Sequence, residues 1–586
     1  MAILLPIGFF LLSLGQALEQ LSQMQVKLSQ GTLTSAQVAE THDQFQRLEQ
    51  LTKPVNVETL NSAVSIGLQL TGVGRHSVNV IKLGKDLSGS IFAGQTIPLA
   101  DTLDNMEQEL ELLKSETART SSSLSQLSDS RFMNLPLLRP LGKRLTNGGV
   151  RLNDGLSYLN LAQTMLPIIS YIAGADGKRV YLILLQNNME LRPAGGFIGS
   201  YGLVTFAGGK LKNLIIEDIY SADGQLRGHI DPPLPLQKYL GLEHWYLRDS
   251  NFQPDFFESA KMAEWFLRKE IGIDVDGVIA LDLTFAKRML EALGGIDLPD
   301  YNERITASNF FLKAQVAAEA DFFPGSTNKR DFLGRFARAF IRELTSGSSL
   351  PWMRLAYAVK TSLDEKHLQL SFHDPRVQGV FDQAGWSGRL LPVVCPEDNS
   401  RLKCLADYVS VVDANVGVNK ANYYLKRDFE HEVKIDKDYL SHQITVYYSN
   451  ESPGETFPSG TYRTFTRVYL AKEADNIEIF FQGQKREAKD LTSDISHDKV
   501  IIGTYLEVLP QQRYQLQVRY NLPLPSSPFL YQLLLQKQAG TEHDSLHLKL
   551  SSDKKIRSSN IAIDKLTAVD YNSDLAIDRL FRFEIE

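Results

Sequence analysis

Cysteine is scarce in this sequence, and its histidines are not clustered. There are two cysteines among 586 residues, Cys395 and Cys404, and neither stands in a CxxC or other zinc-ligand spacing. The 11 histidines are scattered, and no HExxH motif places two of them on one helix face. The sequence therefore argues against metal sites built on histidine and cysteine.

A basic excess and the common phosphate-binding motifs are also missing. The formal net charge is −7, whereas a general nucleic-acid binder needs a basic face, so we expect no nucleic-acid partner. The run Gly195-Gly196-x-x-Gly199 lacks the GxGxxG spacing of dinucleotide-binding proteins, and Ile198 stands where a GxSxG nucleophile motif centred on Ser200 needs glycine. Nothing matches GxxxxGK[ST], and we find no internal repeat.

The N-terminal segment is apolar. Residues 2–18 carry no charge, and as a helix they would span about 25 Å, slightly less than a hydrocarbon core of roughly 30 Å. Three interpretations of residues 1–18 stay open: a membrane anchor, a cleaved signal segment, or an apolar terminus that docks internally. The first predicts a single-pass cell-membrane protein with an extracytoplasmic body, and the second also places the body outside the cytoplasm.

Residues 19–151 are predicted to form a helical stalk. Its clearest apolar seam repeats at alternating spacings of three and four and comprises Leu103, Met106, Leu110, Leu113, Thr117, Thr120, Leu124 and Leu127. Such a seam needs a partner helix. Either a second copy supplies that helix, which would give a self-associating stalk, or the same chain does.

The remaining sequence shows two patterns. Strand-like and helix-like segments alternate over residues 178–430, which predicts an α/β unit with strands near 180–185, 202–206, 211–219 and 277–281. Over residues 431–586, short segments of alternating polarity are separated by turn residues, which predicts a β-sandwich. The predicted fold class is therefore α+β multidomain.

Cys395 and Cys404 flank a loop of turn-forming and polar residues. We predict a disulfide between them, with Cα atoms within about 7 Å of each other. Two isolated buried thiols are the alternative. A disulfide here would indicate an oxidising compartment, because the cytosol keeps such pairs reduced.

The first candidate site lies in the stretch Tyr181–Phe206. A polar break, Gln186–Arg192, follows an apolar run there, and four glycines then occur within eight residues. Such a run lets the backbone approach either another backbone or a ligand. A crossing of two strands and a ligand-facing turn at Gly195 and Gly196, with Arg192 at its mouth, both stay open.

A second candidate is a basic helix. Asp331, Arg335 and Arg338 share one helical face, and Lys329 and Arg330 stand at its entrance. Arginines grouped in this way could clamp a phosphate or pyrophosphate. A solvated helix with an internal ion pair is the alternative.

A third group of charged residues could face a cleft. Arg248 and Asp249 precede a predicted helix, and Asp218 and Asp223 follow the third predicted strand. The carboxyl ends of strands are where α/β folds place their ligands. Together these residues would suit a phosphate-handling site.

Four segments resemble a bacterial family, the domain of unknown function 4012 family: NNMELRPAGGFIGSYG, DSNFQPDFFESA, DVDGVIALDL with LEALGGIDLP, and DANVGVNKANYYL. The resemblance runs from about Lys178 to the C-terminus. More distantly, Gly277–Ile296 and Asp331–Arg338 resemble the LytR-CpsA-Psr phosphotransferases. Those enzymes are membrane-anchored and transfer glycopolymers from a polyprenyl-pyrophosphate carrier to the cell wall, using Mg²⁺, aspartates and arginines.

This resemblance implies a LytR-CpsA-Psr-like central domain and a set of roles. The catalytic residues would be Asp223, Arg248 and Asp249, and Asp218 and Asp223 would bind Mg²⁺. The phosphate-binding residues would be Arg192, Gly195, Gly196, Lys329, Arg330, Arg335 and Arg338. The partners would be the membrane and a polyprenyl-phosphate lipid or cell-wall glycopolymer.

The chain also departs from those enzymes. Ser221-Ala222-Asp223 stands where they carry an Arg-Asp pair, and Pro193–Phe197 offers no match for another of their aspartates. Such losses remove a metal ligand and a phosphate clamp. Two functions therefore stay open. One is an envelope protein that binds or transfers polyprenyl-(pyro)phosphate-linked glycopolymers. The other is a non-catalytic envelope scaffold or adhesion module with a degenerate phosphotransferase-like domain.

Overall fold

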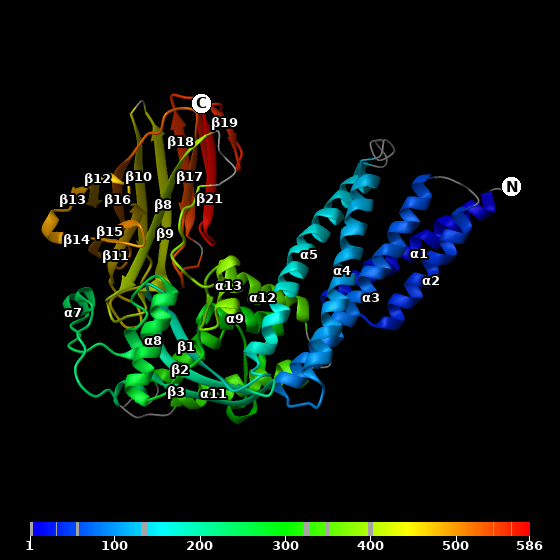
Figure 1. Ribbon diagram of the computed structural model, residues 1–586, viewed down its shortest axis with the longest axis horizontal. Helices are drawn as coiled ribbons and strands as arrows, with labels where there is room; N and C mark the ends of the chain where they lie inside the picture. The colour runs from blue at the N-terminus through cyan, green and yellow to red at the C-terminus, as the bar shows by residue number, and fades with distance from the viewer. Residues whose placement is uncertain are drawn as a thin grey trace.

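The computed structural model describes residues 4–586 except 31, 54–57, 130–138, 320–327, 347–350, 396–401, 437, 543 and 564. The protein is a mixed α+β, multidomain chain. Its N-terminal helices project to one side, and a central sheet with helices connects them to two C-terminal sheets (Figure 1).

Long helices make up the N-terminal part of the chain. They are α1 (Leu4–Ser29), α2 (Ser35–Thr52), α3 (Glu58–Phe92), α4 (Leu99–Ser128) and α5 (Arg139–Ile172). No helix among the described residues is both long and apolar enough to cross a membrane, and residues 1–3 of the expected anchor segment lie outside them.

The seam predicted on α4 is buried along its whole length. It packs against α3 and α5 of the same chain, so the partner helices are internal. The two threonines that interrupt the seam satisfy their hydroxyls within the helix: Thr117 donates to the carbonyl of Leu113 and Thr120 to that of Glu116, both at 2.7 Å. Such bonds let a polar side chain occupy a buried helical position.

The central sheet has the strand order β3-β2-β1-β4-β7, and all its neighbouring strands are antiparallel except β1 and β4. Its strands are β1 (Arg179–Arg192), β2 (Gly195–Ala207), β3 (Lys210–Asp218), β4 (Gly277–Asp282) and β7 (Leu368–Phe372). The apolar stripe of α8 (Phe256–Ile271) covers one face of the sheet. Residues of α5, α12 (Trp352–Asp364) and α13 (Pro375–Gln383) pack on the other.

Short elements connect these parts. They are α6 (Ile219–Asp223), α7 (Leu234–Leu240), η3 (Leu247–Asp249), α9 (Leu283–Leu293), β5 (Ile296–Leu298), η4 (Pro299–Tyr301), β6 (Glu303–Ile305), α10 (Phe310–Glu319) and α11 (Asn328–Ser346). The N-caps of α6, α8 and α9 are Asp218, Asp255 and Asp282, each of which accepts a backbone N–H of the first turn.

Strand β1 differs from its prediction. The polar stretch Gln186–Arg192 was expected to break the strand, but β1 continues through it and pairs with β2, with register shifts on both sides of Asn187. A polar half-strand can be buried here because groups of the central part, such as Thr284, and of the C-terminal part, such as Gly540, accept hydrogen bonds from its side chains.

The C-terminal part consists of two seven-stranded sheets. Their strand orders are β13-β12-β16-β10-β9-β18-β20 and β14-β15-β11-β8-β17-β21-β19. The larger strands are β8 (Lys403–Asn415), β9 (Leu425–Ile435), β10 (Tyr439–Asn450), β11 (Tyr462–Ala471), β12 (Asp475–Phe481), β15 (Lys499–Val508), β16 (Gln512–Pro523), β17 (Phe529–Leu535), β18 (Ser545–Ser552) and β21 (Arg579–Ile585). The shorter elements are η5 (Ala421–Tyr424), β13 (Gln484–Lys485), η6 (Ala488–Asp490), β14 (Leu491–Ser496), β19 (Ile556–Ser559) and β20 (Ala568–Asp574).

Both sheets contribute to one apolar core. Strand β8 and most of β9 pair within these sheets, although they precede residue 431 in the sequence.

Cys395 and Cys404 form a disulfide with their Cα atoms 5.9 Å apart. This confirms the predicted pairing. The bond closes a loop immediately before β8 and therefore lies at the entrance to the C-terminal sheets.

Candidate functional site

Arg192 ends strand β1 and is 2% exposed. Its Nη2 donates to Glu190 Oε1 at 3.0 Å, and its Nε donates to Asp249 Oδ1 at 3.4 Å. Its Nη1 donates to the carbonyl oxygen of Asn415 at 2.8 Å. Each of the three guanidinium nitrogens is therefore engaged by a group of the protein itself.

Arg248 extends this cluster. Its Nη1 donates to Asp223 Oδ2 at 2.8 Å, and its Nε lies 3.4 Å from Asp249 Oδ2. The Tyr246 ring lies beneath the guanidinium at 4.5 Å. Because Asp249 pairs with Arg192 as well, the structure brings four of the candidate residues, Arg192, Asp223, Arg248 and Asp249, into one buried ion-pair chain.

Glu270 adds a carboxyl group that sequence reasoning missed. It lies in the last turn of α8, and its Oε1 accepts the N–H of Leu247 at 3.1 Å. Its Oε2 and Asp223 Oδ1 are buried without a hydrogen-bond partner among the described residues. Burial raises the pKa of Glu270 to about 8 and that of Asp223 to about 6. With Glu190 and Asp249, four carboxyl groups surround two guanidiniums, so the cluster is poorly suited to an additional anion.

The Glu270→Gln variant is expected to gain stability over the wild type as pH rises. A carboxyl whose folded pKa exceeds its unfolded value stabilises the protein below the unfolded pKa, and this contribution is lost as pH rises through the folded pKa. For Glu270 the window runs from about pH 4.5 to about pH 8. The wild type should lose about 1 kcal/mol per pH unit there relative to Glu270→Gln.

Urea unfolding at pH 5.5, 6.5 and 7.5 measures this difference. Glu258→Gln, which changes an exposed carboxylate of the same helix, is the matched control and should show no such trend. A constant difference between wild type and Glu270→Gln across the three pH values would contradict the assignment.

Gly195 and Gly196 are required by close packing of the chain itself. Gly195 has a φ of +125°, and an added Cβ would lie 2.0 Å from Gln186 Oε1. A Cβ on Gly196 would lie 2.3 Å from the backbone carbon of Asn187. The space beside both glycines is therefore filled by β1, which corresponds to the strand-crossing interpretation.

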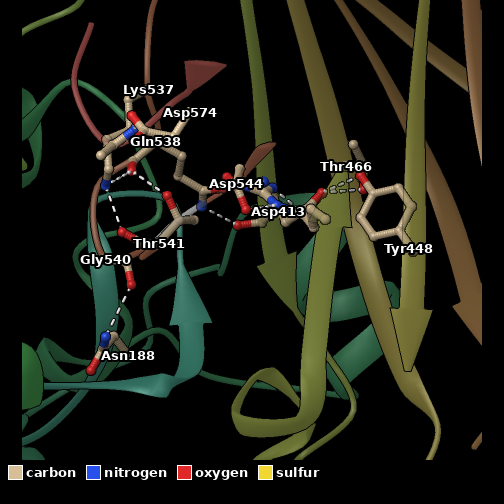
Figure 2. Close-up of polar contacts among 12 residues, drawn as sticks. Asn188, Asp413, Tyr448, Thr466, Lys537, Gln538, Gly540, Thr541, Asp544 and Asp574 are labelled. Atoms are coloured by element: carbon tan, nitrogen blue, oxygen red, sulfur yellow. Dashed lines mark hydrogen bonds and ion pairs between the residues drawn. The ribbon is translucent and has the colours of Figure 1, made fainter. Parts of the chain in front are cut away.

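This turn is part of a joint between the central sheet and the C-terminal sheets. Ala194 bridges to Ala539, which lies in the connection between β17 and β18. From β1, the Asn188 amide donates to the carbonyl oxygen of Gly540 at 3.0 Å. The Gln538 amide donates to the carbonyl of Asp413 at 2.7 Å. Figure 2 shows the segment around Gln538 and Gly540 lying between Asn188 and Asp413.

Two buried lysines complete the joint. Lys366 Nζ donates to Asp578 Oδ1 at 2.7 Å and thereby ties the central part to the β20–β21 connection. Lys537 Nζ donates to the carbonyls of Gln538 at 2.9 Å and Thr541 at 2.7 Å. Burial lowers the pKa of Lys537 to about 8. We refer to the contacts of residues 186–196 and 366 with residues 415, 422, 536–542 and 578 as the interdomain joint.

The basic helix is a separate feature. The side chain of Arg335 is 44% exposed and pairs with Asp300, and Tyr301 lies 6.0 Å from its guanidinium. Arg338 is also exposed. Within the described part of the chain, Arg335 and Arg192 share no contacted residue, and the apolar face of α11 packs on β5 and β6. Lys329 and Arg330 belong to α11, but their side chains lie outside the described part of the structure.

The residues expected to bind Mg²⁺ do not fit a metal site. The Asp218 carboxylate accepts the N–H of Tyr220 at 3.0 Å as the N-cap of α6, whereas Asp223 is paired with Arg248. Among the described residues, no group of three or more His, Cys, Asp and Glu side chains could hold a metal ion.

Sequence signals existed for some of the missed residues. Glu270 continues the apolar stripe Phe256, Ala260, Ala263, Leu267 at helical spacing, so its burial could have been inferred. The polar triplet Gln536–Gln538 follows the fully buried strand β17, but no pattern indicated that its partners lie in β1 and β8.

Comparison with known proteins adds a family match. Residues 176–316, roughly a quarter of the chain, match the family model described as "Protein of unknown function (DUF4012)". The resemblance noted from the sequence is thus shown for this central part. No curated protein matches the chain.

Two solved structures are distantly similar. One is described as a "putative nutrient binding protein" from Legionella pneumophila, with 6% identity, coverage of 30% of this chain and 71% of that chain, and a TM-score of 0.22. The other is an M1 zinc metallopeptidase from Deinococcus radiodurans, with 11% identity, coverage of 27% and 42%, and a TM-score of 0.16. At these TM-scores neither likeness bears on function.

Proposed function

We propose that the protein is a non-catalytic scaffold or adhesion module of the cell envelope, in which a degenerate phosphotransferase-like central domain is structural. One observation carries this proposal. Arg192 is the buried arginine of the candidate site, and each of its three guanidinium nitrogens donates a hydrogen bond to an acceptor of the protein. A phosphate clamp instead needs guanidinium N–H groups that are free to receive the anion.

The surrounding charges support the same proposal. Carboxyl groups outnumber guanidiniums in the cluster, and burial raises the pKa of Glu270 to about 8, so the site disfavours negative charge. A pyrophosphate would add charge of the same sign, which costs free energy in a buried site. Arg335, the other expected clamp residue, is paired with Asp300 at the surface. Exposed pairs of this kind contribute about 0–1 kcal/mol and imply no ligand.

The proposed location rests on the disulfide and on the N-terminal segment. A disulfide such as Cys395–Cys404 is maintained in oxidising compartments, which supports a body outside the cytoplasm. In this proposal the apolar N-terminal residues tether the chain to the membrane, the helices act as a stalk, and the C-terminal sheets form a β-sandwich. The interdomain joint would hold that β-sandwich in a fixed orientation on the central domain.

Isothermal titration with geranylgeranyl pyrophosphate and Mg²⁺ tests the proposal. We expect no binding up to about 1 mM, and the same result for the Arg335→Ala/Arg338→Ala variant. Arg248→Ala serves as the second comparison because its guanidinium is partly exposed. Saturable binding below about 100 μM that Arg248→Ala or the double variant weakens tenfold would instead support the phosphotransferase interpretation.

A further inference from the structure

The outer face of the β13-β12-β16-β10-β9-β18-β20 sheet carries a hollow of about 690 Å³. Two rows of outward-facing side chains line it, and each row crosses neighbouring strands. One row comprises Glu432, Gln443, Arg519 and Glu478. The other comprises Lys434, Ser441 and Asn521, followed by Asn476. We call this surface the β-face hollow.

A β-bulge and two small side chains create the hollow. Asp475 pairs with Asn521 and Glu478 with Arg519, so three steps along β12 match two steps along β16. The bulged residue Asn476 has a φ of +49°. Bulges bend a strand and redirect its side chains. Because Ser441 and Asn521 are shorter than the flanking Lys434 and Arg519, the second row forms the floor.

The hollow is electrically balanced, and most of its charges have partners. Glu478 pairs with Lys485 at 2.6 Å, and Lys434 pairs with Asp436 at 2.8 Å. Glu432 lies 3.7 Å from Lys549. Arg519 Nε donates to Gln443 Oε1 at 3.0 Å. Two carboxylates and two cations therefore line the hollow, and a strongly charged ligand would find no net attraction there.

The floor retains free hydrogen-bonding capacity. Among the described residues, the Ser441 hydroxyl and the Asn521 amide have no side-chain hydrogen bond. A hydroxyl both donates and accepts, and an amide offers two donors and a carbonyl acceptor. Among the described residues of the lining, Ile477 is the only aliphatic one, and the side chains of Tyr520 and His442 are buried. Such a surface complements a neutral ligand that presents donors and acceptors on adjacent atoms.

We propose that the β-face hollow binds a neutral, hydroxyl-rich ligand, namely a segment of an uncharged oligosaccharide. Sugar hydroxyls donate and accept from neighbouring positions, as the floor requires, and carry no charge. The volume lies in the range of roughly 300–1,000 Å³ usual for ligand sites. This inference rests on the proposed adhesion function, because it gives the C-terminal sheets a glycan as their partner.

Affinity electrophoresis of the full chain tests the proposal. The gels contain one neutral polysaccharide each: dextran, galactomannan, xyloglucan, mixed-linkage β-glucan or starch. A gel with hyaluronan provides the anionic comparison. We expect retardation by at least one neutral polysaccharide and none by hyaluronan. Retardation by hyaluronan alone, or by no polysaccharide, overturns the proposal.

Variants assign any retardation to the hollow. Ser441→Tyr fills the floor and Asn521→Ala removes its amide, and each should weaken retardation at least tenfold. Ser449→Tyr is the matched control, because Ser449 lies on the same strand and face but outside the hollow. Equal retardation of Ser441→Tyr, Asn521→Ala and wild type would overturn the proposed site. Circular dichroism verifies that each variant is folded.

Failure of this inference and failure of the proposed function are distinguishable. Absent glycan binding together with absent pyrophosphate binding rejects the hollow but keeps the scaffold interpretation. Glycan binding that Ser441→Tyr abolishes, found together with tight pyrophosphate binding, would keep the hollow and reject the non-catalytic assignment.

Discussion

Replacement of Arg192 by methionine is expected to lower the free energy of unfolding by about 3–5 kcal/mol, the usual cost of removing one partner from a buried ion pair. The substitution leaves the buried carboxylate of Asp249 without its contact to Arg192 and the carbonyl of Asn415 without its donor. It also removes a tie between β1 and the C-terminal sheets. Urea unfolding followed by circular dichroism measures the effect.

Two variants sharpen this test. Arg335→Met removes an exposed pair on α11 and should cost about 0–1 kcal/mol. The double variant Arg192→Met/Asp249→Asn also removes the charge of Asp249, which the single substitution leaves paired with Arg248 alone, and should recover part of the loss. If Arg192 were held ready for an absent anion, its replacement would be neutral or stabilising. That outcome would argue against the scaffold proposal.

The second large effect is expected in the C-terminal core. Arg427 is 5% exposed and lies between two buried carboxylates, with Nη1 2.8 Å from Asp413 and Nη2 2.5 Å from Asp544. Asp413 also accepts the hydroxyls of Thr466 at 2.6 Å and Tyr448 at 3.1 Å. Arg427→Met should therefore lower the free energy of unfolding by about 3–5 kcal/mol.

The control for this prediction is Arg513→Met on the outer face of the same sheet. Arg513 lies 3.3 Å from Asp428, and both side chains are largely exposed, so we expect a loss of about 0–1 kcal/mol. Thermal unfolding of the wild type and both variants makes the comparison. Similar losses for Arg427→Met and Arg513→Met would show that the buried triad is not a principal support of the core.

Local pattern predicted much of the fold. The apolar seam on α4 could be predicted because residues three or four positions apart in a helix lie on the same face. Four of the five strands of the central sheet, the β-rich C-terminal part and the Cys395–Cys404 disulfide could also be predicted, since each depends on periodicity or on residues close in sequence, whereas β7 was missed. Glu270 could have been added by the same rule, because it continues an apolar stripe.

Only part of the candidate site could be predicted from the sequence. The charge types of Arg192, Asp223, Arg248 and Asp249 indicated a cluster, and the structure brings these residues together. The glycine run indicated that a second group lies close to the backbone, but it did not indicate whether that group is another strand or a ligand. The basic helix α11 does not belong to this cluster, because its apolar face packs on β5 and β6.

The sequence by itself thus determined the N-terminal helices, the strand-rich units, the disulfide and the clustering of charge. Tertiary structure alone decided which groups the charged cluster contacts. Arg192 donates to the carbonyl of a residue 223 positions away, and Asn188 to one 352 positions away. A buried arginine has the same residue type whether its acceptors belong to a ligand or to a distant strand. Only the folded chain brings those acceptors within hydrogen-bonding distance, and here they belong to the protein.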